Sequence, residues 1–135
     1  MDNDYFKKLA DRASQASKVP FRQVALACWE MQKNDCHRNV ERWVQAHPES
    51  RAVRGWLFWP PQGGRYDFMA HSVIETNGDL EDITPMDKNT PLESLLFLKH
   101  EGEESDFLAM KETCSRVTYP PFTWEEWREA QDAFL

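Results

Sequence analysis

The chain has 135 residues, of which 41% are hydrophobic and 29% are charged, and its formal net charge is −7. This length is typical of one domain around one core, so we expect residues 1–135 to form a single domain. The negative charge argues against binding to nucleic acid or to an anionic membrane, because both need clustered Lys and Arg. No apolar run approaches the roughly 20 residues that span a bilayer. The acidic start lacks the features of a signal peptide and the three cysteines are an odd number, which together predict a cytoplasmic protein with reduced thiols.

Apolar residues at helical spacing predict three helices in the first third of the chain. The first covers residues 4–17. The second covers residues 21–32, where it would bury Cys28 in the core. The third covers residues 36–46 and ends before Pro48, because the residue before a proline is pushed out of the helical region.

The next segments have the composition of strands. Residues 52–59 are rich in aromatic and β-branched side chains, and residues 60–64 read as a Pro/Gly loop. Residues 65–75 alternate with period two, as a strand with two distinct faces does. Asn77-Gly78 then predicts a tight two-residue hairpin.

This hairpin fixes a register in which Thr76 pairs with Asp79 and His71 pairs with Thr84. Asp82 then points to the same face as His71 and lies diagonally across the ladder from it, within reach of its side chain. The sequence therefore predicts a histidine and a carboxylate in contact on neighbouring strands.

The last 50 residues predict a strand at 94–99, a helix or strand at 107–113, and a final helix. That helix opens with Thr123-x-x-Glu126, a capping-box pattern, and should end near Leu135. Together the elements predict an α+β fold in which N-terminal helices pack on an antiparallel β-sheet.

The third predicted helix places Cys36 in its first turn, after Asn34-Asp35 as a capping pair. A thiol at the positive end of a helix dipole ionises readily. Cys36 as nucleophile, His71 as base and Asp82 as the group that orients the base would form a catalytic triad for acyl chemistry. Backbone N–H groups near Cys36 could hold the oxyanion.

The order Cys, His, acid, with the first residue on a helix and the others on a sheet, resembles the papain-like cysteine hydrolases. The chain also looks like a family of small uncharacterised bacterial proteins, over the run Cys36-x-x-Asn39-Val40, Gly55-Trp56, His71-x-Val73 and Gly78-x-x-x-Asp82-x-Thr84-Pro85. The resemblance implies a papain-like fold, hydrolysis or transfer at an amide or thioester carbonyl, and a protein or peptide-like substrate. It implies no cofactor.

A metal site would use overlapping residues, namely Cys36, His37, His71 and Cys114. None of them has the paired spacing that zinc ligands show, so we expect no metal. In a third interpretation the protein performs no chemistry. Aromatic residues concentrate at binding hot spots, so an acidic inhibitor of the kind that phages or mobile elements encode could bind a partner protein through Trp56, Trp59, Trp124 and Trp127. In the enzyme interpretation, Trp56, Trp59 and the loop 60–64 would shape the acyl pocket.

Overall fold

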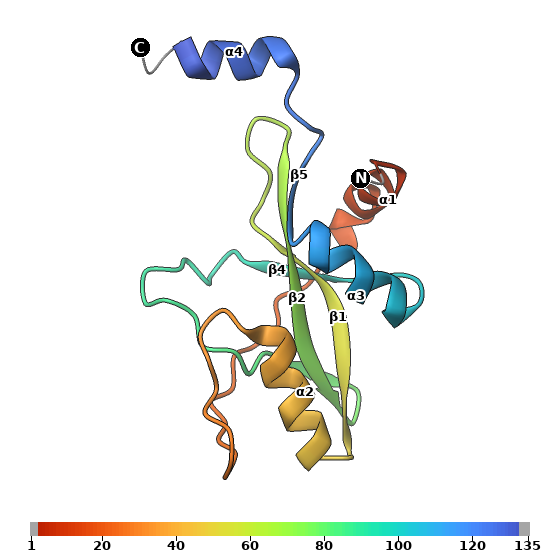
Figure 1. Cartoon of the computed structure of the whole chain (residues 1–135), viewed down its shortest axis with the longest axis vertical. Helices are drawn as coiled ribbons and strands as arrows, with labels where there is room; N and C mark the ends of the chain where they lie inside the picture. The colour runs from red at the N-terminus through yellow and green to blue at the C-terminus, as the bar shows by residue number, and fades with distance from the viewer. Residues whose placement is uncertain (1–2, 133–135) are drawn as a thin grey trace.

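The computed structural model describes residues 3–132 and confirms the α+β class. Four α-helices and a five-stranded antiparallel sheet lie within these residues (Figure 1). The elements are α1 (Asn3–Asp11), the 3-10 helix η1 (Ala13–Gln15), α2 (Cys36–Ala46), β1 (Ser50–Phe58), β2 (Tyr66–Thr76), β3 (Asp79–Glu81), β4 (Leu96–Lys99), α3 (Glu104–Thr113), β5 (Arg116–Tyr119) and α4 (Trp124–Asp132). Within this range, none of the helices has both the length and the apolar character needed to cross a membrane.

The longest strand, β2, is at the centre of the sheet. The order is β3-β2-β1-β4, and β5 also pairs with β2. β3 pairs with residues 74–76 of β2, and β5 pairs with residues 66–69. Residues 71–73 of β2 therefore lie in the gap between these two partner strands, on an edge that a side chain from another element can approach.

The two faces of the sheet are covered differently. On one face, Phe68 of β2 packs with residues of α1 and α3, and Ile74 packs under Val40 and Trp43 of α2. On the other face, Val73 joins an apolar cluster with residues of β1 and β4. We call the first the helical face and the second the open face. His71 lies on the open face because side chains alternate along a strand.

The hairpin prediction is confirmed at its turn. Thr76 pairs with Asp79, and Asn77 and Gly78 have φ of 55° and 87°, the positive values that a type I′ turn requires. The predicted pairing of His71 with Thr84 is wrong, because β3 ends at Glu81.

The chain leaves the β2–β3 ladder at Asp82 because the backbone N–H and carbonyl of Asp82 are hydrogen-bonded to another segment. The Asp82 N–H donates to the carbonyl of Pro20, and its carbonyl accepts from the N–H of Arg22, both at 2.9 Å. At the opposite edge of the sheet, Ser17 forms a bridge with Phe97 of β4. Residues 17–22, which we call the strap, therefore connect the two edges across the open face.

The predicted helix over residues 21–32 is wrong, since this segment has no α-helix and Cys28 is exposed rather than buried. Long-range hydrogen bonds hold it in an irregular path. Besides the strap, the indole N–H of Trp29 and the backbone N–H of Gln32 both donate to Oδ1 of the buried Asn39, each at 3.0 Å. Tertiary contacts of this kind override helical spacing, which is only a weak preference.

The C-terminal part follows the predictions with one omission. β4 lies inside the predicted strand 94–99. Residues 107–113, predicted as a helix or a strand, belong to the helix α3. β5 was not predicted. The capping box is confirmed: the N–H of Glu126 donates to Oγ1 of Thr123, and the N–H of Thr123 donates to Oε1 of Glu126. The predicted helix end at Leu135 lies outside the described residues.

Gly55 of β1 pairs with His71 and leaves room for the ring of Phe97, which contacts His71. A Cβ atom at Gly55 would lie 2.6 Å from Phe97 Cζ and 2.3 Å from a backbone oxygen of β4. We expect Gly55→Ala to destabilise the fold by about 2–3 kcal/mol, because overpacked cores must shift backbone. Urea unfolding measures this. Gly63 has φ +59° and open space around it, so Gly63→Ala should lower the free energy of unfolding by only about 1–2 kcal/mol, the cost of placing a non-glycine residue in the left-handed region. Equal losses in the two variants would contradict the packing argument.

Candidate active site

Cys36 is the first residue of α2, as predicted, and the residue is 6% exposed. Asp35 occupies the N-cap position, but its side chain makes no capping hydrogen bond. Its carboxylate instead pairs with Arg38 at 3.6 Å. The first N–H groups of a helix have no acceptor within the helix. At the start of α2 the Asp35 carboxylate does not accept them either, since it makes no capping hydrogen bond.

His71 lies between Cys36 and Asp82. Its Nε2 is 2.7 Å from Oδ2 of Asp82, which confirms the predicted contact even though the strand pairing behind the prediction is wrong. The other carboxylate oxygen of Asp82 accepts the backbone N–H of Thr84 at 3.1 Å. Because Nε2 is engaged by Asp82, Nδ1 is the ring nitrogen left to interact with Cys36, and this interaction shifts the pKa of both groups.

The electrostatics of this trio favour a thiolate beside an imidazolium. Burial alone would raise the pKa of Cys36, but hydrogen bonds and positive charge from His37 and His71 outweigh it and lower the pKa to about 6. Burial would likewise lower the pKa of His71, but Asp82 and Cys36 raise it to about 10. Between these two values the dominant pair is Cys36 thiolate with His71 imidazolium.

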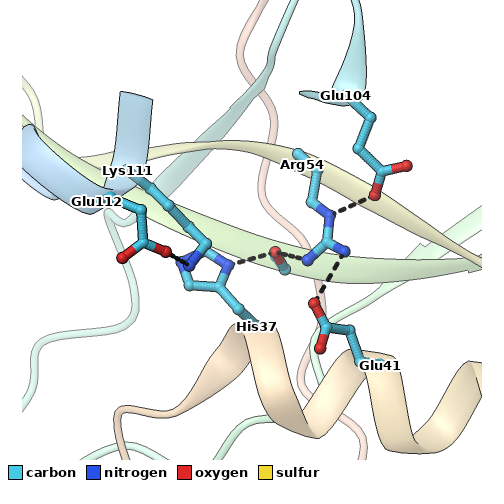
Figure 2. Close-up of polar contacts among 7 residues, drawn as sticks. His37, Glu41, Arg54, Glu104, Lys111 and Glu112 are labelled. Atoms are coloured by element: carbon cyan, nitrogen blue, oxygen red, sulfur yellow. Dashed lines mark hydrogen bonds and ion pairs between the residues drawn. The ribbon is translucent and has the colours of Figure 1, made fainter. Parts of the chain in front are cut away.

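His37 is the second histidine beside Cys36, and a chain of polar contacts holds it (Figure 2). Its Nδ1 lies 2.6 Å from Oγ of Ser72, and Nη1 of Arg54 donates to the same oxygen at 2.8 Å. Arg54 comes from β1 and Ser72 from β2, so the sheet fixes the ring that stands beside the nucleophile.

Arg54 carries a charge that is almost fully buried, with 8% of the residue exposed. Its Nε lies 2.8 Å from Glu104, and its Nη2 lies 3.5 Å from Glu41. A buried cation is stable only when it is paired and hydrogen-bonded, which these two carboxylates and Ser72 provide. The polar group crosses the helical face from α2 to the start of α3 (Figure 2). The sequence does not predict this polar group, although the period-two pattern of residues 65–75 places Ser72 on the face opposite His71.

A pocket of about 250 Å³ opens beside the trio on the open face. Its lining comes from the start of α2, the facing strands β1 and β2, and the segment after β3: Asn34, Cys36, Leu57, Trp59, Met69, Ala70, His71, Thr84, Met86, Thr90 and Leu95.

The two tryptophans predicted to bind have different positions. Trp59 lines the Cys36 pocket. Trp56 is 0% exposed, and its indole N–H donates to the hydroxyl of Tyr5 inside the core. The predicted binding role of Trp56 is therefore wrong, because no partner could reach it. The loop residues Pro60 to Gln62 line a separate pocket.

Metal ligands do not gather at this site. Residues 3–132 contain no group of three or more His, Cys, Asp or Glu placed to hold an ion. All three cysteines are free thiols, and Cys114 packs against the apolar cluster between α1, α3 and the sheet. What the site offers is a nucleophile, a base and a carboxylate.

Comparisons with known proteins found no match: no protein-family model, curated protein or solved structure corresponds to this chain.

Proposed function

We propose that this protein is a cysteine-dependent hydrolase or acyl transferase that acts on an amide or thioester. The observation that carries the proposal is the position of His71, which is hydrogen-bonded to Asp82 through Nε2 and lines the same pocket as Cys36. A nucleophilic triad consists of a nucleophile, a base and a carboxylate that orients the base, and Cys36, His71 and Asp82 have these three kinds of side chain.

In the proposed reaction, the Cys36 thiolate attacks the substrate carbonyl carbon and forms a new C–S bond. The tetrahedral intermediate collapses, and the leaving amine or thiol takes a proton from the His71 imidazolium. His71, now neutral, accepts a proton from the incoming water or acceptor, which attacks the acyl-enzyme and expels the thiolate. Asp82 stabilises the imidazolium at both stages.

The start of α2 supplies a place for the oxyanion in this scheme. The N–H groups of Cys36 and the next residue are at the positive end of an 11-residue helix, and the N-cap side chain does not take them. Such donors stabilise the charge that develops on the carbonyl oxygen in the transition state.

We also propose the papain-like relationship and a cytoplasmic location. The helix on an antiparallel sheet and the order Cys, His, acid support the relationship. The three free thiols support a reducing compartment. A protein or peptide-like substrate and an acyl thioester are both compatible with this chemistry.

Acyl transfer to Cys36 tests the proposal directly. We would incubate the protein with a panel of acyl thioesters, activated esters and peptide amides, and measure intact mass. We expect an acyl adduct that maps to Cys36 and is absent in Cys36→Ser. The matched control is Cys28→Ser, which removes an exposed thiol and should leave the adduct unchanged. If no donor modifies Cys36, or if the adduct maps to Cys28, the proposal fails.

The alternative function is binding of a basic partner protein without chemistry, as an acidic inhibitor would. One observation favours it: Trp124 and Trp127 of α4 stack at 5.0 Å while 67% and 48% exposed. Large exposed aromatics on a protein of net charge −7 suit a partner with a basic surface. The same mass experiment separates the two, since this alternative requires no adduct.

A further inference from the structure

The open face of the sheet carries a groove of about 550 Å³ beside the Cys36 pocket. It is lined by the strap, by the segment after β3 and by Leu57 of β1. Most of its lining is apolar, including Val19, Phe21, Leu57, Met86, Leu92 and Leu95.

The groove adjoins the pocket that holds the proposed nucleophile. Leu57, Met86 and Leu95, together with Thr84, line both the groove and the Cys36 pocket. A substrate whose carbonyl lies at Cys36 would therefore extend into the groove.

The charges and hydrogen bonds of the groove narrow what can occupy it. Lys18 and Glu93 are exposed and of opposite sign, and the Asp82 carboxylate is already bonded to His71. The backbone groups of Pro20 and Arg22, which an extended peptide would need, are already bonded to Asp82. An uncharged chain with no hydrogen-bonding groups of its own suits this lining, and flexible Met86 can adapt to it.

We propose that the groove binds the unbranched aliphatic acyl chain of a thioester whose carbonyl Cys36 attacks. This inference rests on the proposed function and narrows its substrate class. Cys36 sulfur bonds to the acyl carbon, the bond from that carbon to the leaving sulfur breaks, and the leaving thiol takes the His71 proton. Water then releases the fatty acid.

A chain-length series tests the inference. We would measure kcat/KM for acetyl, butanoyl, hexanoyl, octanoyl and decanoyl thioesters of the same small thiol. Because each buried methylene adds about 0.8 kcal/mol, we expect kcat/KM to rise by up to about fourfold per methylene until the groove is filled. Binding of decanoic acid to Cys36→Ser, measured by calorimetry, reports the groove without catalysis.

A matched pair of surface variants locates the effect. Leu92 lines the groove and Phe122 does not, and both are about half exposed, so Asp at either position should not unfold the protein. We expect Leu92→Asp to lower the ratio of decanoyl to acetyl kcat/KM at least about fivefold, and Phe122→Asp to leave the ratio unchanged.

The outcomes separate this inference from the proposed function. Turnover that is independent of chain length would overturn the groove assignment and leave the cysteine chemistry intact. Binding of decanoic acid without acylation of Cys36 by any donor would overturn the chemistry and support the groove. A higher kcat/KM for leucyl peptide amides than for every thioester would show that the groove binds a peptide side chain, and it would overturn the acyl-chain proposal.

Discussion

Replacing His71 with Ala should slow the alkylation of Cys36 by iodoacetamide at pH 7 by between about tenfold and 100-fold. The thiolate is the reactive form, and a thiol whose pKa is about 6 is mostly ionised at this pH. Without His71, burial drives the pKa back toward or above its ordinary value of 9.0, at which roughly 1% is thiolate. The remaining interaction with His37, which also lowers the pKa of Cys36, sets the lower end of the expected range.

The measurement is the rate of mass gain at Cys36, resolved by peptide mapping from Cys28 and Cys114. His47→Ala is the matched control, because His47 follows α2 at its other end and pairs with Glu49. It should leave the rate unchanged. An unaltered rate in His71→Ala, with the fold intact by circular dichroism, would show that His71 does not ionise the thiol.

The parts of the fold that the sequence predicts well depend on local chemistry. Asn77 and Gly78 accept positive φ with little penalty, so the turn position was fixed before any tertiary contact was considered. The side chains of Thr123 and Glu126 each accept the other residue's backbone N–H, so the start of α4 can be predicted from these four consecutive residues alone.

The wrong helix at residues 21–32 and the wrong end of β3 both come from long-range contacts. Residues 21–32 have helical spacing, but their partners are Asp82 and Asn39, far along the chain or across a turn. The same strap ends β3 early, which no local pattern near Glu81 reveals. Trp56 illustrates a related limit, because composition alone does not distinguish a buried tryptophan from one on a binding surface.

The sequence predicts the three central residues of the candidate site, Cys36, His71 and Asp82. It does not predict the polar group around His37 that lies beside them. Register placed His71 and Asp82 together, and the contact survives the early end of β3 because Asp82 still leaves the strand on the open face. His37 drew attention only as a metal ligand. Its connection through Ser72 to Arg54 depends on how α2 lies on the sheet, which spacing does not specify.

Asp82→Asn should lower kcat/KM for acyl transfer by at least about 100-fold. The amide retains the size of the side chain and an oxygen to accept the Thr84 N–H. It removes the negative charge that raises the pKa of His71 to about 10. Its NH₂ group also donates to Nε2, which leaves the proton on Nδ1, facing a thiol that then has no acceptor for its own proton.

The pH profile distinguishes this mechanism from simple loss of structure. In the wild type, activity needs the thiolate, which forms above about pH 6, and the imidazolium, which is lost above about pH 10, so kcat/KM should be bell-shaped between them. In Asp82→Asn the acid limb should move up and the alkaline limb down, which narrows the bell. Asp67→Asn, which breaks an exposed pair with Arg116, should change neither limb. A wild-type profile in Asp82→Asn would remove Asp82 from the mechanism and leave Cys36 and His71 as a dyad.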